Sequence, residues 1–129
     1  DICKIEATGK QIVEALEQGA QKYPEEYGGF LQVSGVRYEI DPAAEQKVGN
    51  VQIEDDAGNL TPIEMDRLYT VGLSSYVAKK GTEVTAFRPS KMLVDNIAAD
   101  SDVLTDFFKS FGGSVPDRYR ESQGRIKIK

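Results

Sequence analysis

Histidine is absent from this 129-residue chain, and this absence excludes several classes of enzyme. Imidazole is the usual general base near neutral pH and a common ligand of hydrolytic zinc centres. A Ser-His-Asp triad is therefore excluded, and a catalytic zinc site would lack its usual ligands. An all-carboxylate magnesium site stays open. We therefore expect that the chain alone is not a self-sufficient hydrolase.

The chain also has little cysteine, no long uncharged stretch and no excess of positive charge, and each of these excludes a further structural or functional class. Cys3 is the single cysteine, so an internal disulfide is excluded. The longest stretch without a charge, Leu68 to Ala78, is much shorter than the ~18 apolar residues of a membrane span. Lys and Arg number 16 against 21 Asp and Glu, and a net charge of −5 argues against binding to a nucleic-acid backbone. A hydrophobic content of 40% is enough for a folded core.

Two segments have the pattern of amphipathic helices. The first is predicted from Gly9 to about Tyr23, with Thr8 as N-cap, Gln11 at capping-box spacing and Pro24 as the terminator. Its apolar stripe is Ile12, Val13, Leu16 and Ala20, while Glu14, Glu17 and Gln18 are expected to face water. The second helix is predicted after a cap at Ser101. Its expected buried face is Val103, Leu104, Phe107, Phe108 and Phe111.

Alternating apolar and polar residues predict a series of short strands around these helices. The predicted strands are Ile2–Ala7, Val36–Ile40, Asn50–Glu54, Leu60–Ile63, Tyr69–Leu73, Val84–Phe87, Met92–Val94 and Ile126–Ile128. A helical turn or loop is predicted from Ser74 to Lys80. Two main helices with a block of strands between them indicate an α+β fold, in which both helices pack on a mixed β-sheet.

The carboxylates do not form a recognisable metal motif. Asp55 and Asp56 precede Gly58 and Asn59 without the twelve-residue spacing and terminal glutamate of a calcium loop, so a turn is predicted there. Asp102 and Asp106 are four residues apart on one helix face, which indicates a solvated face. No catalytic residue and no metal ligand is therefore assigned within the chain.

Two aromatic residues stand at predicted junctions between loops and regular elements. Phe30 follows the flexible pair Gly28-Gly29, and Tyr76 follows a predicted strand. Rings at such junctions can stack on a ring-shaped ligand. They can equally fill the core, and spacing alone favours that simpler interpretation.

The segment FLQVSGVRY (residues 30–38), preceded by TGKQ (8–11) and EALE (14–17), resembles the C-terminal domain of the 5'-nucleotidase family. That family includes UDP-sugar hydrolases and 2',3'-cyclic-nucleotide 2'-phosphodiesterases. The resemblance continues through Asp41-Pro42, LYTV (68–71), SDVL (101–104) and GRI (124–126), and so covers nearly the whole chain.

The resemblance implies that residues 1–129 are most of one substrate-binding domain, truncated at its N-terminal side. A preceding metallophosphoesterase domain would hold a pair of divalent metal ions and hydrolyse nucleotide phosphate esters, while this part holds no cofactor. The implied partners are a nucleotide or nucleoside and that N-terminal domain, with no nucleic acid and no membrane span in this part. The implied location is extracellular or in the cell envelope.

By the same resemblance, Phe30 and Tyr76 would stack on opposite faces of the base, and Ser75, Gly81 and Thr82 would complete the binding site. Two positions depart from the family pattern: Ser75 stands where asparagine is usual, and Thr82 where aspartate is usual. Threonine accepts a hydrogen bond without charge assistance. A degenerate domain that keeps the fold without binding nucleotide is therefore the alternative, with a stand-alone protein-interaction module as a third.

Overall fold

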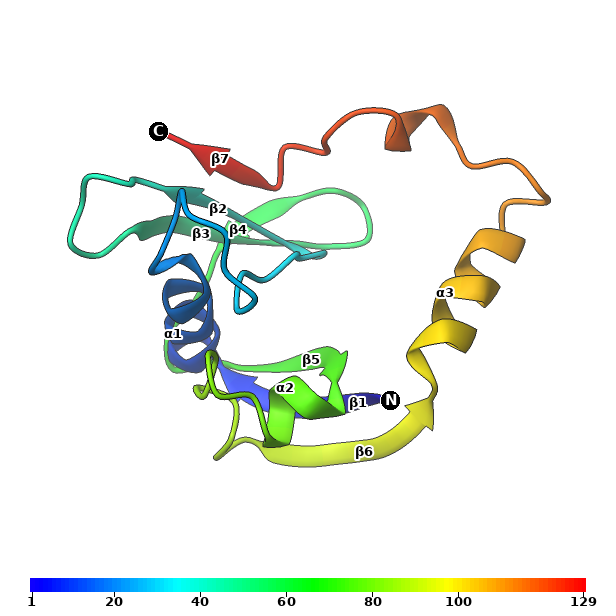
Figure 1. The fold of residues 1–129 in the computed structure, drawn as a ribbon, viewed down its shortest axis with the longest axis horizontal. Helices are drawn as coiled ribbons and strands as arrows, with labels where there is room; N and C mark the ends of the chain where they lie inside the picture. Colours follow the sequence, from blue (N-terminus) through cyan, green and yellow to red (C-terminus); the bar gives the residue numbers. More distant parts are fainter.

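The computed structural model describes all 129 residues and confirms the α+β class. Figure 1 shows the strands gathered into two sheets that lie above and below α1. In chain order the elements are β1 (Ile2–Thr8), α1 (Gly9–Ala20), β2 (Val36–Ile40), β3 (Val48–Glu54), β4 (Leu60–Pro62), β5 (Leu68–Ser74), α2 (Ser75–Lys79), β6 (Lys91–Ala98), α3 (Asp100–Lys109), a 3₁₀ turn (Asp117–Tyr119) and β7 (Ile126–Ile128).

The strands form two sheets rather than the one sheet that the sequence predicted. One sheet has the order β5-β1-β6 and is antiparallel throughout. The other has the order β4-β3-β2-β7 and is mixed, because β7 pairs with β2 in the parallel direction. Two parallel strands must be joined by a long crossover connection. Here the connection from β2 to β7 contains all the elements from β3 to the 3₁₀ turn.

The core lies where α1 meets the strands of both sheets. The inward residues of β1, Cys3, Ile5 and Ala7, are almost completely excluded from solvent. Ile12 and Leu16 of α1 and Tyr38 and Ile40 of β2 belong to the same buried cluster. Helix α1 therefore packs on both sheets and connects them into one core.

The start of α1 confirms the predicted capping box. The Gln11 backbone N–H donates to Thr8 Oγ1 at 3.1 Å, and the Thr8 N–H donates to Gln11 Oε1 at 2.9 Å. Since Thr8 also ends β1, the strand passes into the helix without a connecting loop. The orientation of α1 is thus set by β1.

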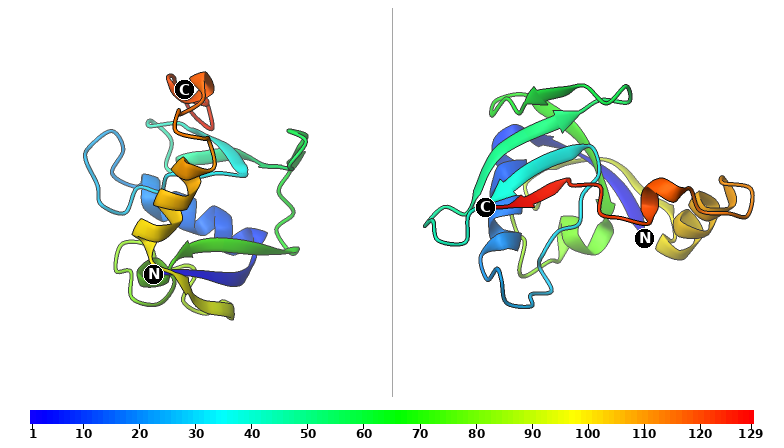
Figure 2. Two further views of the ribbon diagram at one scale, coloured as in Figure 1. Left: turned by 90° about the vertical axis from the view of Figure 1, so that its right-hand side faces the viewer. Right: turned by 90° about the horizontal axis from the view of Figure 1, so that it is seen from above.

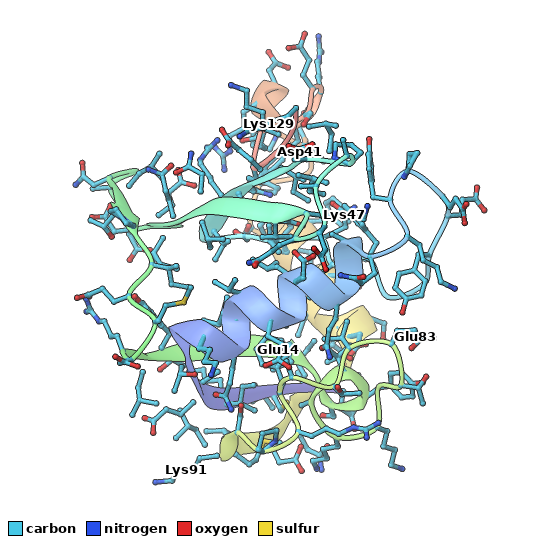
Figure 3. All side chains as sticks on the ribbon, turned by 90° about the vertical axis from the view of Figure 1, so that its left-hand side faces the viewer. Glu14, Asp41, Lys47, Glu83, Lys91 and Lys129 are labelled. Carbon is cyan, nitrogen blue, oxygen red and sulfur yellow. The ribbon has the colours of Figure 1, made fainter.

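Two of the three side chains expected to face water on α1 make structural contacts instead. The Glu17 carboxylate accepts the backbone N–H groups of Lys47 and Val48 at 2.9 and 2.7 Å, which ties α1 to the start of β3. Gln18 Oε1 accepts the N–H groups of Thr85 and Ala86 at 2.9 and 3.1 Å. Glu14 is exposed as predicted, and Figure 3 shows it on the outer side of α1.

The predicted strand Val84–Phe87 is wrong, and the Gln18 contacts give the physical reason. Backbone N–H groups that a strand would pair with a neighbouring strand are taken by the Gln18 side chain. The segment has no regular structure at Val84 and enters a turn at Ala86, although Val84, Ala86 and Phe87 are buried. Its apolar pattern therefore reflected burial and not strand pairing.

The predictions for the second helix need two corrections. Helix α3 begins at Asp100, its N-cap position is Ala99, and no side chain caps it, so Ser101 is not the cap. None of its residues is buried, whereas five apolar residues were predicted to face the core. Figures 1 and 2 show why: α3 leaves the sheet after β6 and stands apart, on the side opposite α1.

The capping box yields a stability prediction. Thr8→Ala removes the acceptor for the Gln11 N–H and should lower the free energy of unfolding by about 0.5–2 kcal/mol, the usual effect of losing an N-cap. Ser101→Ala is the matched control and should change stability little, since Ser101 caps nothing. Urea denaturation of both variants measures the difference. Equal denaturation midpoints would contradict the role of Thr8.

Candidate functional site

Phe30 lies inside the loop between α1 and β2, which continues up to Val36, and not at the junction with a regular element that the sequence predicted. Its side chain is half-buried and packs against the core, with its ring centroid 6.4 Å from that of Tyr23. Phe30 also lines an open groove of about 380 Å³ on the surface. Arg125 and Ile126, at the start of β7, line the same groove. Phe30 thus both contributes to packing and reaches a surface groove.

Tyr76 lies on α2, directly after β5. Its side chain is 57% exposed, so it does not fill the core. Ser74 caps the helix by accepting the Val77 N–H at 3.2 Å, and the Tyr76 carbonyl accepts the N–H groups of Lys80 and Gly81, both at 2.7 Å. The backbone at Tyr76 is therefore well held while its ring is open to solvent.

Ser75 is part of a polar contact between α2 and β6. Its hydroxyl donates to Asp95 Oδ1 at 3.4 Å, and Lys79 forms an ion pair with the same carboxylate. The hydrogen bond from Lys79 holds the pKa of Asp95 below its ordinary value of 3.8, and the Asn96 N–H adds to this effect. Asp95 and Lys79 thus fix the helix that carries Tyr76.

Gly81 and Thr82 begin the turn-rich segment after α2. The Gly81 carbonyl accepts from Arg88 Nη2 at 2.6 Å, and a Cβ at Gly81 would lie 2.9 Å from the Val84 carbonyl oxygen. Only glycine therefore fits that backbone without displacement. Thr82 Oγ1 donates to Glu83 Oε2 at 3.1 Å on the exposed surface.

The structure brings the loop of Phe30 and the loop of Thr82 into contact. A Cβ on Gly29 would lie 2.6 Å from Glu83 Cβ and 2.8 Å from the Tyr27 ring. Figure 3 shows Glu83 beside the loop that follows α1. The Gly29–Phe30 and Thr82–Glu83 segments, about fifty residues apart in sequence, are thus neighbours in space.

A larger cleft of about 520 Å³ separates the two sheets beside α1. Leu31 and Val33 line it from the loop of Phe30, and Val77 lines it from α2. Leu31 follows Phe30 and Val77 follows Tyr76, so the residue after each predicted stacking ring lines the same apolar cleft. Phe30 and Tyr76 themselves are not among the residues that line it.

The carboxylates do not converge on a metal position. No group of three or more His, Cys, Asp or Glu side chains lies close enough to share an ion. Asp55 instead accepts the backbone N–H groups of Ala57 and Asn59 at 3.0 and 2.8 Å, which confirms the turn predicted there. The Asn59 N–H is the main reason that the pKa of Asp55 lies below 3.8.

Three residues that support this region were not recognised in the sequence. Gln18 holds the segment after Thr82, and the Lys79–Asp95 pair holds α2. Lys79 and Asp95 are 16 positions apart and belong to different elements, so no local spacing signals their contact. Gln18 occupies a helix position that looks solvent-exposed from periodicity alone.

The sequence and the fold agree on one family. The family described as "5'-nucleotidase, C-terminal domain" matches residues 1–89. The chain therefore belongs to the 5'-nucleotidase C-terminal domain family. None of its helices has the length and apolar character needed to cross a lipid bilayer.

Individual proteins show the same similarity. The chain is 32% identical over 122 residues to the trifunctional nucleotide phosphoesterase protein YfkN of Bacillus subtilis, covering 93% of this chain and 8% of that protein. It is 32% identical over 111 residues to the cell wall protein Lmo0130 of Listeria monocytogenes, covering 81% of this chain and 13% of that protein.

Among solved structures, the 5'-nucleotidase precursor from Thermus thermophilus superposes with a TM-score of 0.86 at 25% identity, over 98% of this chain and 25% of that one. The chain thus spans a quarter or less of the length of these relatives. This similarity confirms the predicted fold of a 5'-nucleotidase C-terminal domain.

The contact between the two loops yields a second prediction. Gly29→Ala places a methyl group against Glu83 Cβ and the Tyr27 ring and should destabilise the fold by about 1–3 kcal/mol. Gly28→Ala is the matched control: nothing lies within 4 Å of its Cβ position, so it should be nearly neutral. Thermal denaturation of the two variants compares them. Equal melting temperatures would show that the loops do not meet as described.

The ion pair on α2 yields a third prediction. Lys79→Met should raise the pKa of Asp95 toward 3.8, because the main cause of its depression is removed. A depressed pKa in the folded state means that the pair stabilises the fold above the unfolded pKa and loses this effect as pH falls through the folded pKa. NMR titration of the Asp95 carboxyl group measures the shift. Lys80→Met, which removes an exposed neighbouring charge, should leave that pKa unchanged.

Proposed function

We propose that this chain binds the base of a nucleotide for a two-domain phosphoesterase, in which a preceding metallophosphoesterase domain hydrolyses the phosphate ester. The observation that carries the proposal is the exposed ring of Tyr76 on a firmly held backbone, next to an apolar cleft shared with the loop of Phe30. An aromatic side chain that is open to solvent yet fixed at its base is suited to stacking on a planar ligand.

The neighbouring polar groups suit the edge of such a ligand. Thr82 Oγ1 uses its proton toward Glu83, which leaves oxygen lone pairs free to accept from a ligand hydroxyl or amine. Ser75 is directed to Asp95, so it contributes mainly by holding α2 in place. Gly81 lets the backbone turn tightly between Tyr76 and Thr82.

We propose that the hydrolytic step is carried out by the preceding domain. The chain offers no histidine and no group of side chains that fits a metal ion, so no metal-dependent step is assigned to it. In our proposal the metal pair resides in the preceding domain, and residues 1–129 are most of the C-terminal domain. The relationship to a cell wall protein supports a location outside the cytoplasm or in the envelope.

A specific observation also favours the second candidate, a domain that keeps the fold without binding nucleotide. Phe30 and Tyr76 do not line a common cavity, and Thr82 replaces the charged acceptor that the family pattern carries. The two functions differ in one measurable respect. Only the first makes substrate affinity depend on the Tyr76 ring.

The fourth prediction concerns this dependence in the full-length protein. Tyr76→Ala should raise the KM for nucleotide substrates by roughly 5- to 150-fold, because stacking a base on an aromatic ring contributes about 1–3 kcal/mol. Phe30→Ala should act in the same direction. Steady-state hydrolysis of a nucleoside monophosphate measures KM and kcat, and a base-free aryl phosphate should show little change with either variant.

Two controls keep the test specific. Tyr76→Phe retains the ring and should behave like the wild type. Met65→Ala removes another exposed apolar side chain, between β4 and β5, and should leave KM unchanged. An unaltered nucleotide KM in folded Tyr76→Ala would contradict base stacking and support the non-binding domain.

A further inference from the structure

The groove beside Phe30 contains a cation that has no anionic partner in the chain. Arg125 lines this groove directly before β7 and is half-buried. Its Nη1 group donates to the Val33 carbonyl oxygen at 3.3 Å, whereas its Nε and Nη2 groups have no protein acceptor. None of the six ion pairs of the chain includes Arg125. Burying a charge without a partner is costly, so the free donors of Arg125 are suited to an acceptor from outside the chain.

A second arginine nearby shows the contrasting arrangement. Arg37 on β2 donates from Nε and Nη2 to the two carboxylate oxygens of Glu54, at 3.1 and 3.4 Å. Its Nη1 group donates to the carbonyl oxygens of Gln123 and Gly124 at 3.1 and 3.3 Å. Every side-chain nitrogen of Arg37 therefore has a protein acceptor, and its role is structural. Arg125 differs because its Nε and Nη2 groups, which lie side by side on the guanidinium, form a free two-donor fork.

An amide acceptor lines the same groove. Gln123 Nε2 donates to the carbonyl oxygen of Arg118, so Gln123 Oε1 is left to accept a hydrogen bond. The volume of about 380 Å³ lies within the usual range for a small-molecule site. The groove thus combines an aromatic residue, Phe30, with a two-donor fork and one amide acceptor.

We propose that Arg125 and Gln123 recognise the edge of a 6-oxopurine base, so that the full-length protein prefers guanine and hypoxanthine nucleotides to adenine nucleotides. This inference rests on the proposed function, since it requires that Phe30 contacts the base. A 6-oxopurine presents two neighbouring acceptors, O6 and N7, which a guanidinium fork binds with two hydrogen bonds. Its N1–H group is a donor that Gln123 Oε1 can accept.

Adenine has the opposite hydrogen-bonding pattern at two of these positions. It carries an amino donor in place of O6 and a lone pair at N1 in place of N1–H. In the same pose the amino group would face the N–H groups of Arg125, and N1 would face Gln123 Oε1. Turning the Gln123 amide around to donate to N1 would break its hydrogen bond to the Arg118 carbonyl oxygen. The groove therefore discriminates against adenine with both side chains.

Steady-state hydrolysis of guanosine, inosine and adenosine monophosphates by the full-length protein tests this preference. We expect kcat/KM to be roughly 5- to 150-fold higher for the two 6-oxopurine substrates, the discrimination of one bidentate arginine–purine pair. Arg125→Lys keeps the charge but removes the fork, and should lower this ratio at least about 5-fold. Lys127→Met removes an exposed cation on β7 that does not line the groove, and as the matched control should leave the ratio unchanged.

Gln123→Leu is an independent second variant on the surface of the groove. It should lower kcat/KM for the 6-oxopurine substrates more than for adenosine monophosphate, and this result decides the question if Arg125→Lys does not fold. Melting temperatures and hydrolysis of a base-free aryl phosphate should be little changed by either substitution.

Two results would overturn the inference: equal hydrolysis of guanosine and adenosine monophosphates by the unsubstituted protein, or an unchanged ratio in folded Arg125→Lys. The proposed function has a separate outcome. If Tyr76→Ala raises KM for all three nucleotides while none of them is preferred, base stacking stands and only the recognition of the base edge is wrong. If KM for none of them depends on Phe30 or Tyr76, the proposed function is contradicted as well.

Discussion

The position of β1 is the constraint on which the rest of the structure depends. This strand pairs with β5 and β6 on its two edges, and its inward side chains, Cys3, Ile5 and Ala7, are sealed beneath α1. Because Thr8 both ends β1 and caps α1, the helix has no freedom to swing relative to the sheet. The side chains of Glu17 and Gln18 hydrogen-bond to backbone N–H groups and so fix β3 and the segment after α2 relative to α1.

The candidate site is positioned by the same two elements, β1 and α1. The loop of Phe30 lies against α1, since a Cβ on Gly19 would lie 2.7 Å from the Gly29 carbonyl oxygen. Helix α2, which carries Tyr76, follows β5 directly and is held to β6 through Asp95. Neighbours of β1 thus position the residues that follow the two aromatic rings, Leu31 and Val77, at one apolar cleft. A rigid framework of this kind reduces the conformational cost of binding a planar ligand.

Helix α3 shows the limit of amphipathic patterning. The stripes of α1 and α3 predicted two buried faces, and only that of α1 is buried within these residues. Hydrophobic periodicity predicts that one face of a helix packs against apolar residues, but it does not indicate which part of the protein provides those residues. The same limit explains Val84–Phe87, where the predicted strand is wrong although Val84, Ala86 and Phe87 are buried. There a glutamine side chain, and not a neighbouring strand, takes the backbone N–H groups.

Local signals in the sequence determined the α+β class, most strand positions, the Thr8–Gln11 capping box and the turn at Asp55, because each depends on residues only a few positions apart. The family was also evident from short motifs, and the match over residues 1–89 confirms it. Only the tertiary structure decided the division into two sheets, the contact of Gly29 with Glu83 and the exposure of Tyr76. These features depend on contacts between residues far apart in the chain, and such contacts leave no periodic trace in the order of the amino acids.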